Sequence, residues 1–265
     1  MDKKTIMIAL GGNSLSPKGY SGTVGEQFSF TRKTMNHLSE FILKDYNICI
    51  THGNGPQVGN ELLRMDLTND VIPPLPLGIC VANTQGQIGY MVQQTLQNKL
   101  RDLEVDREVV TLVTQVLVDK NDKSIKNPTK FVGARYTKEE IDELAKKLNW
   151  IVKEQEPGSW RRVVPSPMPE YIMHGKSIKA LVDRGTIVIA FGGGGIPVFN
   201  NDNGQIEGLD AVIDKDFSAA KMGRIIRAQE LWIISDIDYL YSNFGTENAR
   251  PIKEIGTKEL QSLYN

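Results

Sequence analysis

Short apolar runs that end abruptly in glycine or polar residues constrain the fold of this chain more than any other feature. The runs are nearly continuous rather than alternating, and many of their residues are β-branched. Such runs are typical of strands in a parallel sheet that is covered on both faces. We therefore predict strands at residues 5–10, 48–51, 109–118, 186–191 and 231–235.

Segments with helical spacing separate these strands, which gives the chain the βαβ rhythm of an α/β fold. Helices are predicted at residues 27–43, 84–103 and 138–148, the last opened by Thr137 and Glu140 in the spacing of a capping box. Residues 119–169 interrupt the rhythm, because they are polar and carry four prolines near their end. We expect this stretch to form an inserted subdomain.

The composition argues against nucleic acid and membranes as binding partners. The 31 basic and 32 acidic side chains give a net charge of -1, so no overall field attracts nucleic acid or an anionic membrane. No stretch approaches the roughly 20 apolar residues of a membrane span. Cys49 and Cys80 lack the spacing of a disulfide framework or a zinc site, and both are expected to be buried. These features indicate a cytoplasmic protein with a small-molecule partner.

Glycines follow three of the predicted strands, at the ends where parallel sheets bind ligands. They are Gly11 with Gly12, Gly53 with Gly55, and the four consecutive glycines 192–195. Backbone N–H groups at such exits can cradle an anion without side-chain charge, so we expect them to approach phosphate. The plainer alternative is that these glycines only make tight turns. No P-loop motif occurs. A dinucleotide-binding fold is disfavoured as well, because the sequence offers no position for the Asp or Glu that binds the ribose in such folds.

Charged residues that could act on a phosphate lie toward the end of the chain. Asp216 is expected to cap a helix beginning near Phe217, which places Lys215 at the positive end of the helix dipole, where an anion is favoured. The alternative is a solvated lysine between two acidic neighbours.

Spacing alone favours an ordinary loop position for Lys130 and a structural, hydrogen-bonded role for His52.

Asp236 and Asp238 alternate along the exit of the last predicted strand. They either cap the next turn or face a nucleotide or Mg²⁺. Phosphoryl transfer requires phosphates held in line, with their charge neutralised by amides, lysines and Mg²⁺. The residues above suit that chemistry better than acyl transfer, because no nucleophilic Ser or Cys is paired with a His in a recognisable motif.

The order of the motifs resembles that of the carbamate kinases, members of the amino acid kinase family. The similar motifs, spread over about residues 5–260, are "IALGGN", "ITHGNGPQVG", "TQGQIGY", "TLVTQVLVD", "NPTKFVG", "GSWRRVVPSPMP", "IAFGGGGIPV", "AVIDKD" and "SDID". Within the family, the joint occurrence of "GGN", "HGNGPQVG", "WRRVVPSP" and "GGGGIPV" is specific to carbamate kinases.

The resemblance implies a three-layer αβα sandwich on a mainly parallel open sheet, with residues 119–169 as a protruding subdomain, and a homodimer. It implies reversible, Mg²⁺-dependent phosphoryl transfer between ATP and carbamate, giving ADP and carbamoyl phosphate, often run toward ATP in arginine fermentation. Two alternatives stay open. One is a catalytically impaired nucleotide-binding paralogue, and the other is a kinase acting on another small carboxylate or carbamate-like molecule.

The resemblance also implies roles for individual residues. Lys215 would neutralise the moving phosphoryl group, Asp216 would organise it, and Lys130 would reach in from the protruding subdomain. The implied substrate-binding amides are those of Gly11, Gly12, Asn13, Gly53, Asn54 and Gly55. The implied nucleotide-binding residues are Gly193, Gly194, Gly195, Ser235, Asp236, Asp238 and Tyr241. No side chain is assigned as a direct metal ligand.

The resemblance departs from the family pattern at the end of the chain. Carbamate kinases normally continue past the position of Leu260 with a Gly-Met-Gly-Pro-Lys-like loop, which adds another lysine on the phosphates, and with the last strands and helix. We therefore expect residues 1–265 to form a single amino acid kinase domain without that usual C-terminal end.

Overall fold

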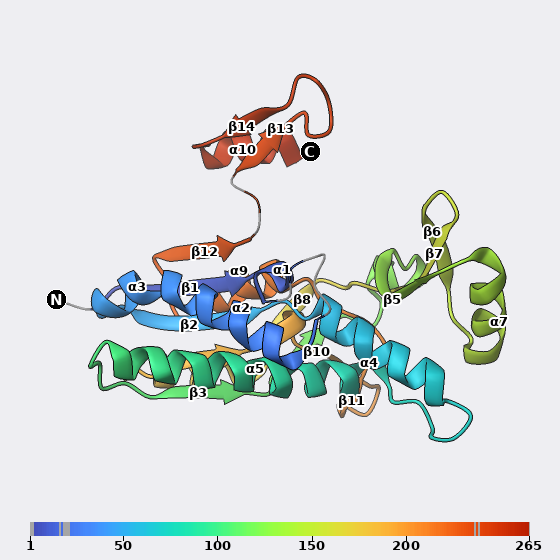
Figure 1. Ribbon diagram of the computed structural model, residues 1–265, viewed down its shortest axis with the longest axis horizontal. Coiled ribbons are helices and arrows are strands. Elements are labelled where there is room, and N and C mark those ends of the chain that lie inside the picture. The colour runs from blue at the N-terminus through green and yellow to red at the C-terminus, as the bar shows by residue number, and fades with distance from the viewer. Residues whose placement is uncertain (1–2, 16, 18–21, 236, 238, 265) are drawn as a thin grey trace. The chain divides into compact units, whose positions relative to one another are not determined.

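A sheet of five parallel strands lies at the centre of the larger of the chain's two units, Met1–Ile234 and Ser235–Asn265 (Figure 1). The computed structural model describes residues 3–15, 17, 22–235, 237 and 239–264. The strand order is β12-β1-β2-β9-β3. The strands are β1 (Thr5–Leu10), β2 (Asn47–His52), β3 (Val109–Leu112), β9 (Ile187–Ala190) and β12 (Glu230–Ile234). The predicted parallel sheet is confirmed.

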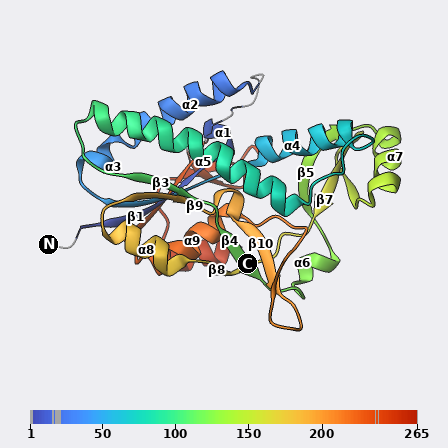
Figure 2. The same ribbon diagram turned by 90° about the horizontal axis from the view of Figure 1, so that it is seen from below.

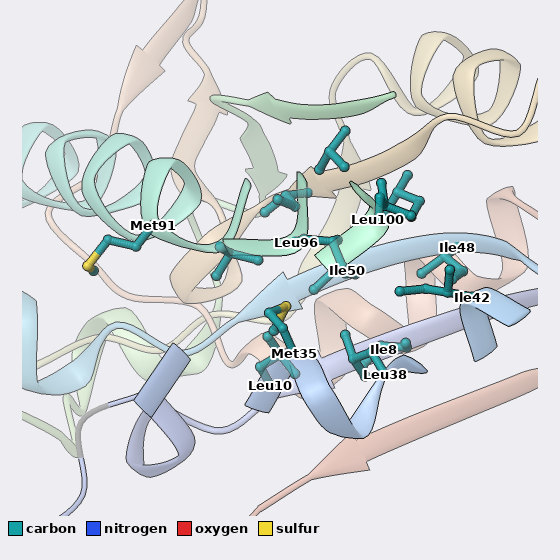
Figure 3. Close-up of a cluster of buried hydrophobic side chains, with 14 of the residues drawn as sticks. Ile8, Leu10, Met35, Leu38, Ile42, Ile48, Ile50, Met91, Leu96 and Leu100 are labelled. Atoms are coloured by element: carbon teal, nitrogen blue, oxygen red, sulfur yellow. The ribbon is translucent and has the colours of Figure 1, made fainter. Parts of the chain in front are cut away.

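Helices cover both faces of this sheet, and the three layers predicted from the resemblance are confirmed (Figure 2). One face is covered by α2 (Val24–His37), α3 (Ser39–Leu43) and α5 (Leu77–Asp102), and the other by α8 (Gly175–Asp183) and α9 (Lys215–Ile225). Alternate residues of β1 serve the two cores: Ile8 packs under α2 and α5, whereas Met7 packs with α9. Figure 3 shows the first of these cores.

The predicted strand 109–118 is wrong as a single strand, because it divides between two sheets. Its first part is β3, and its second part is β4 (Gln115–Val118) in a sheet of order β11-β10-β4-β8. The other members are β8 (Pro169–Ile172), β10 (Ile196–Asn200) and β11 (Ile206–Gly208). The buried side chain of Gln85 binds both the N–H and the C=O of Thr114, at 2.7 and 3.2 Å. These bonds satisfy the backbone at the point where the chain leaves the first sheet.

A small antiparallel sheet of order β5-β7-β6 occupies the predicted insertion, residues 119–169. This subdomain contains α6 (Lys123–Lys126), β5 (Lys130–Tyr136), α7 (Lys138–Leu148), β6 (Val152–Glu156) and β7 (Ser159–Val164). The predicted capping box of Thr137 and Glu140 at the start of α7 is confirmed. The helix α4 (Gly55–Thr68) packs against β5 through a core that includes Val58, Leu62 and Val132.

The edge strand β12 departs from the prediction that every strand is covered on both faces. Leu231, Trp232 and Ile233 are 41%, 44% and 55% exposed, whereas β1 and β2 are buried throughout. The difference follows from position, because β12 pairs with β1 on one side only in the described sheet. Apolar periodicity cannot distinguish an edge strand from a central one.

The described residues of the second unit, Ser235–Asn265, form two short antiparallel strands and one helix. They are β13 (Leu240–Ser242), β14 (Arg250–Ile252) and α10 (Thr257–Tyr264). Throughout the part of the chain that the structure describes, no helix combines the length and the apolar character needed to cross a membrane.

Candidate functional site

A cavity of about 470 Å³ in the first unit brings together residues that the sequence places far apart. Its walls come from the loop between β2 and α4, the beginning of β5, the η1 turn (Gly192–Gly194) and the start of α9. Of the predicted site residues, those that line it are Gly53, Asn54, Gly55, Lys130, Gly193, Lys215 and Asp216.

The loops after β1 and β2 touch through their glycines. A Cβ on Gly53 would lie 2.7 Å from the backbone nitrogen of Gly12, so no other residue fits there without displacing the neighbouring loop. The N–H of Gly53 donates to Leu10 at 2.8 Å, and the N–H of Gly11 donates to Ile234 at 2.7 Å. These two amides therefore extend the sheet and are already engaged. The amides of Gly12, Asn13, Asn54 and Gly55 stay as predicted anion donors.

The glycine run 192–195 has a packing role that the sequence analysis missed. A Cβ on Gly192 would lie 2.2 Å from the His52 ring, and one on Gly193 would lie 2.2 Å from the side-chain nitrogen of Asn54. A Cβ on Gly194 would meet the carbonyl oxygen of Ile213 at 2.3 Å, and one on Gly195 would meet Val116 at 2.2 Å. Protein atoms thus fill the space next to each glycine. Their predicted contact with nucleotide phosphates stays a prediction, with Gly193 on the cavity wall.

Helix α9 begins two residues earlier than predicted. Asp214, not Asp216, is the N-cap, because its side chain accepts a hydrogen bond from the N–H of Asp216 at 2.9 Å. The extended backbone of Asp214 suits a cap, whereas Asp216 lies inside the helix. Lys215 is therefore the first helical residue. Its Nζ donates to Asp216 at 2.6 Å, and its side chain is 17% exposed.

Lys130 is the first residue of β5, so its predicted loop position is corrected. Its Nζ lies 3.2 Å from the second carboxylate oxygen of Asp214. Burial raises the pKa of the Asp214 carboxyl, but the Asp216 N–H and the charges of Lys130 and Lys215 outweigh it and hold that pKa below its usual value. Asp214 thus joins the subdomain to the start of α9 with one charged side chain.

His52 is buried beside the cavity wall. Burial lowers the pKa of its ring to about 4, so the imidazole is neutral at physiological pH, and its Nδ1 lies 3.1 Å from the carbonyl oxygen of Gly53. A neutral ring packed against Gly192 is consistent with the predicted structural role.

The depressed pKa of His52 predicts a pH dependence of stability. Above about pH 6.5 the ring is neutral in both states; as pH falls toward 4, only the unfolded state gains the proton, so the free energy of unfolding decreases. We expect this group to account for about 3 kcal/mol of the decrease between pH 7 and 4, at about 1.4 kcal/mol per pH unit. Urea unfolding of wild type and His52→Gln at several pH values measures it. The exposed His37→Gln is the matched control, and equal pH slopes for wild type and His52→Gln would contradict the prediction.

Arg161, on β7, also lines the cavity, and no role was predicted for it. The only signal in the sequence is its place in "GSWRRVVPSPMP", which does not distinguish it from its neighbour Arg162.

Of the predicted nucleotide-binding residues toward the end of the chain, the structure describes Ser235 and Tyr241. Ser235 and Tyr241 lie in the second unit, where the hydroxyl of Ser235 accepts a hydrogen bond from the N–H of Ile237 at 3.2 Å. Asp236 and Asp238 lie outside the described residues. The role of these four residues stays a prediction.

Comparison with known proteins assigns the chain to a family. The model of the amino acid kinase family matches residues 4–265. The chain belongs to the amino acid kinase family.

The relatives of this amino acid kinase include carbamate kinases. The chain is 45% identical to the carbamate kinase of Pyrococcus furiosus over 263 residues, which cover 98% of the chain and 83% of that protein. It is 43% identical to carbamate kinase 2 of Staphylococcus epidermidis, covering 97% of the chain and 82% of that protein. The solved structure of carbamate kinase from Giardia lamblia bound to AMP-PNP matches with a TM-score of 0.90 and 36% identity, covering 99% of the chain and 83% of that structure.

Proposed function

We propose that this amino acid kinase is a carbamate kinase, which transfers a phosphoryl group reversibly between ATP and carbamate. One observation carries the proposal: Lys130 and Lys215, from separate elements, line the same cavity. The similarity to carbamate kinases over 98% of the chain supports the choice of substrate.

The geometry suits charge neutralisation rather than covalent catalysis. The first turns of α4 and α9 begin at the cavity, so their N–H groups and dipoles favour an anion there. In the structure each lysine has an aspartate partner, Lys130 with Asp214 and Lys215 with Asp216. A phosphoryl group would replace or share these partners, and the two ammonium groups would stabilise the negative charge of the transition state.

We propose Mg²⁺ as the cofactor, carried by the nucleotide. Within the described ranges, no three His, Cys, Asp or Glu side chains converge as a metal cage. A nucleotide-bound Mg²⁺ requires only one or two protein carboxylates, and Asp214 and Asp216 are the carboxylates at the cavity. When bound, the ion would neutralise phosphate charge.

We further propose a cytoplasmic homodimer that forms ATP during arginine breakdown. The free, buried Cys49 and Cys80 support a reducing compartment such as the cytoplasm. The exposed side chains of Ile79 and Tyr90 on α5, 47% and 58% exposed, support a dimer, because a partner subunit would cover such apolar surface. Light scattering coupled to size exclusion is expected to give twice the chain mass.

A direct assay tests the proposed reaction. Purified protein supplied with Mg²⁺, ADP and carbamoyl phosphate is expected to form ATP, measured by luciferase, above the rate of the uncatalysed mixture. If the protein formed no ATP from carbamoyl phosphate but formed ADP from ATP with another small carboxylate, the acceptor would be that carboxylate and not carbamate. Nucleotide binding without turnover of any acceptor would contradict the proposed function.

Two substitutions of Asp214 separate its two contacts. Asn is as good an N-cap as Asp, but it removes the charge that holds Lys130. We therefore expect Asp214→Asn to lower kcat about tenfold, as a mispositioned group does, while leaving stability within about 1 kcal/mol. Asp214→Ala should lower kcat similarly and also cost about 1 kcal/mol of unfolding free energy through the lost cap. Wild-type kcat in Asp214→Asn would show that the Lys130 contact does not matter for turnover.

A further inference from the structure

The sheet of the protruding subdomain carries three arginines with different partners. Arg135 forms two hydrogen bonds to Glu156, at 2.7 and 2.9 Å, and Arg162 pairs with Asp210 at 2.6 Å. Arg161 instead donates to two uncharged oxygens, the carbonyl of Gly133 at 2.8 Å and the side chain of Gln155 at 3.0 Å. Among the described residues, Arg161 makes no ion pair.

Arg161 lies opposite a bulge in β5 and lines the cavity. Val132 pairs with Arg162, and the next pair joins Tyr136 to Trp160, so three residues of β5 oppose Arg161 alone. Successive side chains of a strand point to opposite faces. Arg162 accordingly lies against Trp150 and lines a different pocket, whereas Arg161 lines the cavity of Lys130 and Lys215.

The charge of Arg161 is not compensated. Burial, and to a lesser degree the nearby Arg135, lowers the pKa of its guanidinium, and its Nε is buried without a hydrogen-bond partner in the described structure. The other charges at the cavity are two lysines and the two aspartates that pair with them. The guanidinium of Arg161 therefore offers an anion in the cavity a positive charge without an ion-pair partner among the described residues. A guanidinium has five N–H donors, and those of Arg161 that bond neither Gly133 nor Gln155 can donate to the anion.

We propose that Arg161 binds the anionic group of the small, non-nucleotide substrate in this cavity, through a phosphate or carboxylate oxygen. The proposal rests on the proposed function, under which that substrate is carbamoyl phosphate or carbamate. A guanidinium already oriented by Gly133 and Gln155 is fixed for such a contact, and its planar fork matches oxyanions better than an ammonium does. The guanidinium also lies over the ring of Phe131 on the described cavity wall, with its carbon 6.0 Å from the ring centroid.

Kinetics of variants test the proposal. Arg161→Met is expected to raise KM for carbamoyl phosphate about 10- to 100-fold, the loss typical of a charge-assisted hydrogen bond, while KM for ADP changes less than threefold. Arg161→Lys keeps the charge without the fork and should raise KM for carbamoyl phosphate about tenfold. The matched control is Arg135→Met, in the same sheet, with wild-type values for both substrates. An unchanged KM for carbamoyl phosphate, or a parallel rise for ADP, would overturn the proposal.

Calorimetry separates this inference from the proposed function. Wild type that forms no ATP but binds carbamoyl phosphate, with affinity lost in Arg161→Met, would refute the function and keep the inference. Wild type that binds no carbamoyl phosphate would overturn the inference. Thermal unfolding establishes that each variant is folded; if Arg161→Met does not fold, Arg161→Lys decides alone, and wild-type affinity in that variant counts against the proposal.

Discussion

Replacing Lys215 with methionine is expected to lower kcat for ATP formation about a thousandfold, because a positioned charge next to the transferred group is lost. The Lys215 side chain is only 17% exposed and belongs to the first residue of α9, where the helix dipole also favours negative charge. Methionine keeps most of the side-chain volume. Initial rates at saturating ADP and carbamoyl phosphate measure the loss.

A lysine on the same helix provides the control for Lys215. Lys221 donates to the carbonyl oxygen of Glu170 at 2.8 Å and does not line the cavity. Lys221→Met should keep kcat within about twofold of wild type, since surface substitutions away from a site have small effects. If Lys215→Met retained more than a tenth of the wild-type kcat, the role assigned to this lysine would be wrong.

Replacing Gly194 with alanine is expected to cost about 4 kcal/mol of unfolding free energy. Two effects add: a φ of +92°, which L-residues adopt at a cost of about 1–2 kcal/mol, and a Cβ placed 2.3 Å from the Ile213 carbonyl oxygen, which forces the backbone apart. The displaced residue directly precedes Asp214 and Lys215. Urea unfolding measures the loss, and activity should fall with it.

Gly185 separates the two effects, because its φ is +90° and its Cβ would meet nothing within 4 Å. Gly185→Ala should therefore cost only the 1–2 kcal/mol of the backbone conformation. Equal losses in the two variants would show that the contact between the glycine run and Ile213 carries no energy.

The sequence predicted the elements whose signals are local. β1 and the capping box of α7 were placed to the residue, because apolar continuity and the Thr137–Glu140 spacing depend on neighbouring residues alone. The break between β3 and β4 depends on Gln85, a buried residue of a different element that bonds Thr114. No window of residues 109–118 contains that information.

The site was predicted only in part, because some of its features depend on contacts between residues that are distant in sequence. Lys130, Lys215 and Asp216 were placed through the resemblance, and the structure brings them to one cavity. The N-cap of α9 was predicted at Asp216 but is Asp214, two residues earlier. The two aspartates have the same side chain, so only backbone geometry distinguishes them. The choice between Arg161 and Arg162 depends on which face of β7 is turned to the cavity. The packing of the glycine run depends on residues 52, 54, 116 and 213, which are distant in sequence.

A crystal structure with AMP-PNP and Mg²⁺ tests the central claim most directly, namely that the cavity between α4, β5 and α9 holds the transferred phosphoryl group. We predict that the γ-phosphate lies in this cavity, within hydrogen-bond distance of the Nζ of Lys215. A γ-phosphate bound outside the cavity, with Lys215 still paired only to Asp216, would contradict the account.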